Sequence, residues 1–85
     1  MKIHTRKKVK SYERYYLFEK NNYRCVNCNL AFPKPLNYDG RNTIIFNNLW
    51  LEIDHIVPIS RGGIDDIENK QILCNVCNCK KGNKL

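Results

Sequence analysis

The sequence lacks any run of apolar residues approaching the roughly 20 that a membrane-spanning helix requires, which argues against a membrane partner. It also lacks internal repeats, low-complexity segments and a Pro- or Gly-rich linker. Its first residues are polar and basic, unlike a secretory signal, so we expect a cytoplasmic, intracellular protein. At 85 residues the chain predicts one domain, of a size at which a hydrophobic core alone gives marginal stability.

Acidic side chains are scarce in this chain. There are 8 Asp and Glu against 15 Lys and Arg, which gives a formal net charge of +7. Residues 1–24 hold eight basic and two acidic side chains, a local balance of +6. A segment this basic is suited to binding a polyanion such as nucleic acid, because neutralised phosphates release their counterions. A basic terminus can also serve solubility alone. We interpret residues 1–10 as a basic flexible arm and expect Lys7 and Lys8 to contact nucleic-acid phosphates.

The five cysteines are an odd number, which disfavours a secreted disulfide scaffold. Four of them form two pairs with a two-residue spacer, and this spacer lets both thiolates of a pair bind one metal. The pairs predict one tetrahedral, structural Zn²⁺, whose binding free energy adds to the stability of the small fold. Its ligands are Cys25, Cys28, Cys74 and Cys77. The fifth, Cys79, is expected to have a packing role or none.

Residue patterns predict an α+β domain over residues 11–85. In chain order we expect an aromatic-rich helix (residues 11–22), a loop (30–42), two β-prone runs (43–46 and 49–53), a short strand (70–73) and a closing helix (75–81). Aromatic residues at helical spacing in the first helix predict a face packed into the core, although such rings can also stack on bases. Alternating apolar and polar residues in the second β-prone run are typical of a half-buried strand.

Asp54 and His55 follow that run directly. A histidine with a pKa near neutrality can take a proton from water, and an adjacent carboxylate can hold a hard divalent ion. An isolated Asp-His pair more often makes ordinary surface hydrogen bonds. Here Asn69 and Asn78 follow in order on either side of the second cysteine pair, nine residues apart, and this arrangement favours the functional interpretation.

The segments LEIDHIVPISRGG (residues 51–63) and DIENKQILCNVCNCKKG (residues 66–82) resemble the HNH endonucleases. That family carries a ββα-metal motif with an Asp-His pair on the first strand, a central Asn, and a final His or Asn on the helix. The resemblance covers residues 25–28 and about 50–83. It implies a small zinc-stabilised ββα-metal domain, preceded here by a helix and a basic arm.

By this resemblance His55 is the general base, Asp54 a metal ligand, Asn69 the residue that orients His55, and Asn78 the second ligand. Because an amide oxygen is a harder ligand than imidazole, Asn at the final position favours Mg²⁺ or Mn²⁺ as the catalytic ion. Three basic residues near the motif are expected to hold flanking DNA phosphates, namely Arg61, Lys80 and Lys81. The acidic loop residues Asp65, Asp66 and Glu68 are interpreted as turn and cap residues rather than as further ligands.

The sequence therefore predicts a metal-dependent DNA endonuclease, acting as a monomer or homodimer or within a larger nucleic-acid-processing assembly. The alternative is a non-catalytic, zinc-stabilised module that binds nucleic acid. Such a module would need the four cysteines and the lysines, but it would have no use for the ordered set of Asp54, His55, Asn69 and Asn78.

Overall fold

The computed structural model describes residues 10–82, and the predicted contacts of Lys7 and Lys8 lie outside this range. Two helices and three strands make up the fold, with single 3₁₀ turns in between: α1 (Ser11–Lys20), β1 (Ile45–Phe46), β2 (Leu49–His55), β3 (Lys70–Cys74) and α2 (Asn75–Lys81), with turns at Ile59–Arg61 and Ile67–Asn69. The predicted α+β class is confirmed. None of the helices among the described residues is long and apolar enough to cross a membrane.

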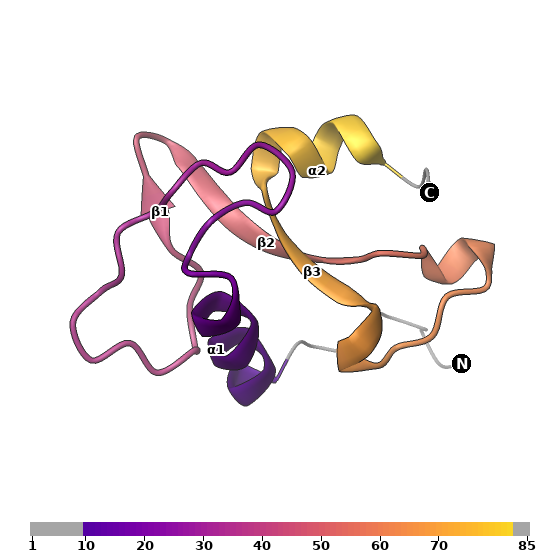
Figure 1. Cartoon of the computed structure of the whole chain (residues 1–85), viewed down its shortest axis with the longest axis horizontal. Helices are drawn as coiled ribbons and strands as arrows, with labels where there is room; N and C mark the ends of the chain where they lie inside the picture. The colour runs from indigo at the N-terminus through magenta and orange to yellow at the C-terminus, as the bar shows by residue number, and fades with distance from the viewer. Residues whose placement is uncertain (1–9, 83–85) are drawn as a thin grey trace, which may run out of the picture.

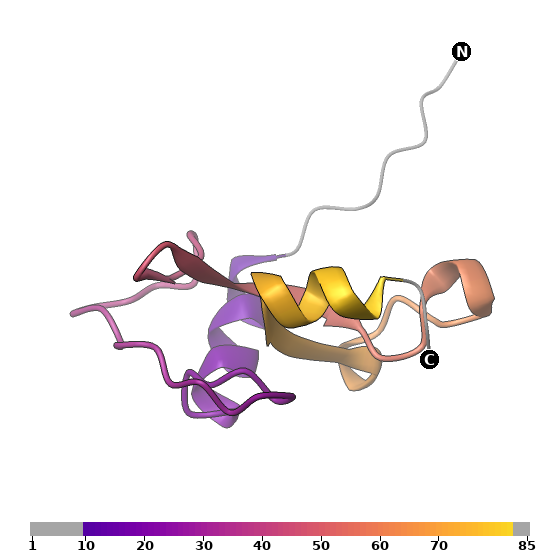
Figure 2. The ribbon, with the colours of Figure 1, turned by 90° about the horizontal axis from the view of Figure 1, so that it is seen from above.

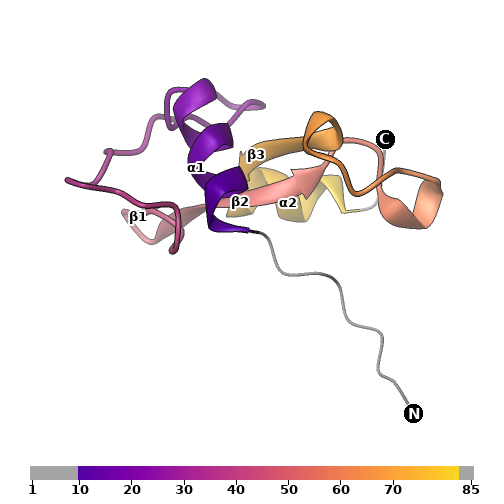
Figure 3. The same cartoon turned by 90° about the horizontal axis from the view of Figure 1, so that it is seen from below.

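The sheet is antiparallel with strand order β1-β2-β3. In the β2–β3 register Leu51 pairs with Cys74 and His55 pairs with Lys70. The chain passes from β3 into α2 without a loop, and α2 folds back against β2 and β3. Figures 1 and 2 show α2 on one side of the β2–β3 hairpin, and Figures 1 and 3 show α1 on the other. This order of two strands and a helix is the ββα arrangement that the sequence predicts.

The core lies between α1 and the sheet. Phe18 on α1 and Ile72 on β3 are fully buried, and Leu51 on β2 is only 1% exposed. The Phe18 ring stacks on Tyr38 from the long loop before β1, with ring centroids 5.8 Å apart. This loop therefore packs against the Phe18 side of α1. Alternation in β2 explains the burial of Leu51, because every second residue faces the same side of a strand.

Three tyrosines on α1 depart from the sequence-based expectation that its aromatic residues form a core face. Tyr12, Tyr15 and Tyr16 are 63%, 41% and 50% exposed, whereas the following Leu17 and Phe18 are buried. A helix of ten residues that contacts its neighbours along one side can bury only a narrow stripe, and here Leu17 and Phe18 occupy that stripe. The prediction that the aromatic residues of this helix pack into the core is therefore right for Phe18 and wrong for the three tyrosines.

Candidate active site and cysteine cluster

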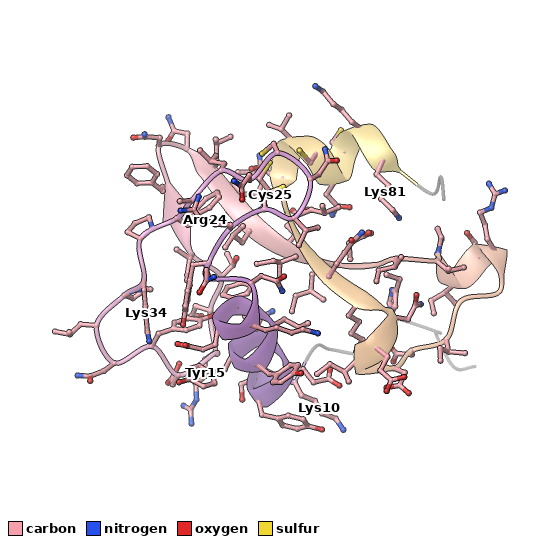
Figure 4. All side chains as sticks on the ribbon, in the orientation of Figure 1. Lys10, Tyr15, Arg24, Cys25, Lys34 and Lys81 are labelled. Atoms are coloured by element: carbon pink, nitrogen blue, oxygen red, sulfur yellow. The ribbon has the colours of Figure 1, made fainter. Side chains whose placement is uncertain are left out.

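The structure brings the four paired cysteines together. Their Sγ atoms all lie within 4.8 Å of one another, although the two pairs come from the loop after α1 and from the junction of β3 with α2. A backbone hydrogen bond of 3.0 Å from Val26 to Ile72 holds the first pair against β3. Cys79 is exposed and lies outside the cluster. In Figure 4 the loop that carries Cys25 lies beside the start of α2.

The pKa values of these thiols are shifted in opposite directions. Burial works to raise the pKa of the Cys25 thiol, but backbone amides, including those of Cys28 and Cys74, point at its sulfur and lower that pKa to about 7. Burial also raises the pKa of Cys74. Four sulfurs this close together cannot all be thiolates without a compensating positive charge, so the chemistry of the cluster fits one zinc ion.

His55 is the last residue of β2, and its side chain is 28% exposed. The ring atom Nε2 lies 2.9 Å from Oδ1 of Asp65, in the loop between β2 and β3. Lys70, which is the cross-strand neighbour of His55, places its Nζ 3.3 Å from the same carboxylate oxygen. Hydrogen bonds from His55 and Lys70 lower the pKa of Asp65. The imidazole is therefore held by a carboxylate that the sequence interpretation assigned to a turn.

Asn69 ties the ends of this loop together. Its Oδ1 accepts a hydrogen bond of 2.9 Å from Val57 N, and its Nδ2 donates to the carbonyls of Val57 (3.0 Å) and Ile64 (2.8 Å). Its own carbonyl accepts from Ile56 N at 2.9 Å. These contacts are with the backbone that follows His55, and they fix the direction in which the chain leaves β2.

Gly63 allows the loop to close in this way. A Cβ added there would lie 1.8 Å from Val57 O and 2.9 Å from Nδ2 of Asn69, so no side chain fits between Gly63 and the backbone that follows His55. Gly63 N also donates to Pro58 O at 2.9 Å. From the sequence, Gly62 and Gly63 indicate only a loop. The structure shows that Gly63 must be glycine, because the backbone of Val57 lies too close for a side chain.

Asp54 and Asn78 come from β2 and α2, which pack against each other. Oδ2 of Asp54 lies 3.0 Å from Lys81 Nζ and accepts from Gln71 Nε2 at 3.1 Å. Asn78 donates its Nδ2 to Glu52 Oε1. The hydrogen bonds and ion pairs of the described residues thus join Asp54 to Lys81 and Asn78 to Glu52, and they do not join the two expected ligands directly.

The oxygen donors at this place fit a hard divalent ion. The amide nitrogen of Asn78 is committed to Glu52, and its Oδ1 has no hydrogen-bond partner among residues 10–82. Glu52 is itself fixed, because its Oε2 accepts from Trp50 Nε1 at 2.6 Å. Asp54 is paired with the ammonium group of Lys81, which a bound divalent ion would have to displace from Oδ2 or share the carboxylate with. A carboxylate and an amide oxygen are ligands that Mg²⁺ and Mn²⁺ accept.

The three basic residues expected to contact DNA differ in their surroundings. Arg61 and Lys80 are exposed, whereas Lys81 points from α2 toward β2 (Figure 4) and is only 16% exposed. A hollow of about 420 Å³ opens beside Lys80 and Lys81, and Asn27 and Gln71 are among the other polar residues that line it. Its lining includes Cys77 of the cysteine cluster and Gln71 and Lys81, which both contact Asp54, and its two lysines carry positive charge.

Sequence reasoning missed Asp65, Lys70 and Glu52 as parts of this site. Glu52 could have been found, because it stands two positions before Asp54 on a predicted strand and therefore shares its face. Lys70 could have been found only from the strand register, which the spacing of the motif does not give. Asp65 has no local signal, since its contact with His55 depends on how the loop closes.

Part of this chain is similar to known proteins. The family profile described as HNH endonuclease matches residues 25–84, which is more than half of the chain. The type IV methyl-directed restriction enzyme EcoKMcrA of Escherichia coli (strain K12) is 40% identical over 53 residues. That alignment covers 62% of this chain but only 16% of the enzyme, so the likeness is to a small part of that protein. No solved structure matches significantly.

Proposed function

The chain belongs to the HNH endonuclease family, and we propose that it is a metal-dependent endonuclease that hydrolyses phosphodiester bonds of DNA. The observation that carries the proposal is that β2 ends in Asp54 and His55 and packs against α2, which carries Asn78 and whose Lys81 donates to the His55 carbonyl at 3.0 Å. A base, a carboxylate and an amide at one strand–helix junction are the groups that such hydrolysis needs. The Escherichia coli relative is by name a restriction enzyme, which agrees with DNA as the substrate.

In this proposal His55 is the general base. Its neutral imidazole takes a proton from a water molecule, and the resulting hydroxide attacks the scissile phosphorus while the bond to the leaving oxygen breaks. Asn69 acts through the backbone, because its side chain fixes the loop that follows His55. Arg61 and Lys80, both exposed, bind flanking phosphates and hold the strand in place.

Asp54 and Asn78, through the Asn78 Oδ1, would hold the divalent ion, Mg²⁺ or Mn²⁺. When bound, such an ion polarises the phosphate and stabilises negative charge on the leaving oxygen. Glu52 supports this role by keeping the Asn78 amide turned with its nitrogen toward β2. The four clustered cysteines would hold a separate, structural zinc, because a site closed by four sulfurs leaves no position for water or substrate.

Replacement of His55 by Ala tests the proposal. The variant should keep its zinc and its DNA affinity, because neither the cysteines nor Asp54 and Asn78 change. Its rate of nicking a supercoiled plasmid with Mg²⁺ or Mn²⁺ should fall by roughly 10²–10⁴-fold, the usual worth of general-base catalysis. His4→Ala, which removes the other histidine of the chain, is the matched control and should nick at the parental rate.

Excess Mn²⁺ should partly restore Asp54→Ala and Asn78→Ala but not His55→Ala, because added metal cannot replace a missing base. Parental nicking by His55→Ala would contradict the proposal. So would a parental protein that holds zinc and binds DNA but does not cut it with either ion, and the zinc-stabilised binding module would then be the better account.

A further inference from the structure

Asp65 lies in the loop between β2 and β3, yet its carboxylate is bonded to side chains outside the loop. Oδ1 is 2.9 Å from His55 Nε2 and 3.3 Å from Lys70 Nζ. A cap or turn role would instead require a bond to nearby backbone amides. The 3₁₀ turn that follows begins after Asp66, and no side chain caps it. Asp65 therefore serves the end of β2 rather than the conformation of its own loop.

Lys70 holds this carboxylate in place. Its side chain is only 6% exposed, and its Nζ also lies 2.9 Å from Oε1 of Glu13 on α1. A lysine this buried keeps its charge only beside carboxylates, and Glu13 and Asp65 provide two. Hydrogen bonds to both raise the pKa of Lys70 against the opposing effect of burial. Two ion pairs and a hydrogen bond thus connect Glu13 of α1, through Lys70 and Asp65, to the imidazole of His55.

The contact with Asp65 decides which nitrogen of His55 is free. An ionised carboxylate accepts hydrogen bonds and cannot donate them, so Nε2 of His55 must carry the ring proton in this pair. In the neutral ring Nδ1 is then the nitrogen with a lone pair, and it is the atom able to take a proton from water. After that transfer the ring is an imidazolium, which a neighbouring carboxylate stabilises.

We propose that Asp65 is a positioning residue for His55: it holds the imidazole in the tautomer with the proton on Nε2 and directs Nδ1 toward the attacking water. Lys70, anchored by Glu13 of α1, keeps Asp65 in place. The role in cleavage rests on the proposed function, but the tautomer and the hydrogen bond do not. The first helix thereby contributes to the site through Glu13, although it lies outside the two strands and helix of the family motif.

Kinetics of Asp65 variants test the role in cleavage. Asp65→Asn should lower kcat by roughly 10–100-fold, the usual cost of losing a partner that orients a functional histidine, with KM for DNA unchanged. Asp65→Glu, which keeps the charge, should recover part of this loss. The matched control is Asp66→Asn, which removes the same charge from the next residue and should keep the parental kcat. Equal kcat values for Asp65→Asn and Asp66→Asn would overturn the proposal.

A second measurement does not depend on activity. Long-range ¹H–¹⁵N spectra of the zinc-loaded protein, without divalent ion and at about pH 8 where an ordinary imidazole is neutral, report the tautomer of each histidine. We expect His55 to carry its proton on Nε2 in the parental protein and to become a mixture of tautomers in Asp65→Ala. An Nδ1-protonated or mixed His55 in the parental protein would overturn the proposal. A parental protein with the expected tautomer but no nicking would instead refute the proposed function alone.

Discussion

Lys81 on α2 forms an ion pair with Asp54 on β2, with 3.0 Å between Nζ and Oδ2, and the same nitrogen donates to the carbonyl of His55 at 3.0 Å. The Lys81 and Asp54 side chains are only 16% and 13% exposed. An ammonium group therefore neutralises the carboxylate that we propose as a ligand of the divalent ion. Because the ammonium already pairs with Oδ2 and repels a second cation, we expect binding of the ion to compete with Lys81.

Lys81→Met tests this competition. Without its lysine the largely buried Asp54 carboxylate is unpaired, so we expect a lower Tm in the absence of divalent ions. Mn²⁺ should then bind more tightly and raise Tm by more than it does in the parental protein, because ligand binding stabilises the folded state in proportion to ln(1 + [L]/Kd). Thermal melts with and without Mn²⁺, together with calorimetric titration, measure both effects.

Lys80→Met is the control for that experiment. Lys80 precedes Lys81 on α2, carries the same charge and is exposed, so its loss should leave Tm and the Mn²⁺ response close to parental values. If Lys81→Met and Lys80→Met show the same Mn²⁺ response, then Lys81 does not compete for the Asp54 carboxylate.

The cysteine cluster predicts a sharp division among the five cysteines. Cys28→Ser or Cys74→Ser removes one sulfur from a closed four-ligand site, and we expect the purified protein to lose zinc and unfold or aggregate. Cys79→Ser, in the same helix as Cys77 but outside the cluster, should keep about one zinc per chain, as expected for a four-sulfur site, and a parental Tm. A well-folded parental protein without zinc would refute the structural metal.

Residue patterns predicted the α+β class and the two cysteine pairs, whereas the ββα order was implied by the resemblance to the HNH endonucleases. The two-residue spacers identify the cysteine pairs, and alternation around Leu51 identifies the strand that ends at His55. These features depend on residues a few positions apart, whose geometry the backbone fixes without reference to the rest of the chain.

The contacts of the site depend on tertiary structure and were not predictable in the same way. Asp65 meets His55 only because Asn69 and Gly63 close the loop, and Lys70 meets Glu13 only because α1 packs on β3. The exposure of Tyr12 likewise follows from how little of α1 the sheet covers, which helical periodicity does not reveal.

Asn69→Ala should loosen the loop after His55. It removes three side-chain hydrogen bonds to backbone groups of Val57 and Ile64, each worth about 0.5–1.5 kcal/mol. We expect a loss of roughly 2–4 kcal/mol of unfolding free energy by denaturant titration. Asn75→Ala, which removes a single side-chain bond to Trp50 N, should cost less. Equal losses would show that Asn69 does not hold the loop.

Gly63→Ala provides an independent test of the same loop. The added Cβ would collide with Val57 O at 1.8 Å, so the loop must open and separate Asp65 from His55. We expect both a lower stability and a slower cleavage step. Gly62→Ala meets no atom within 4 Å and is opposed only by its positive φ of 92°, at a cost of about 1 kcal/mol. A Gly63→Ala protein as stable and active as Gly62→Ala would contradict the close approach.

The basic N-terminal segment should contribute affinity for DNA rather than chemistry. Deleting residues 1–9 removes the positive charges of Lys2, Arg6, Lys7 and Lys8 and leaves every described element in place. For every phosphate that the protein no longer neutralises, the slope of log affinity against log salt should fall by about 0.9 on duplex DNA. The cleavage rate at saturating DNA should stay parental, because His55, Asp54 and the cysteines are unchanged.

A matched point variant separates this effect from net charge alone. Lys34→Gln removes one exposed charge whose ammonium already pairs with Glu19 at 2.6 Å, so it should leave the salt slope unchanged, whereas Lys7→Gln should reduce it. Filter-binding or anisotropy titrations between about 50 and 200 mM salt cover the range in which counterion release dominates. If the deletion changes neither the affinity nor the slope, the segment does not contact phosphates and its charges serve solubility. If the slope falls together with the cleavage rate at saturation, the segment also positions the scissile strand at His55.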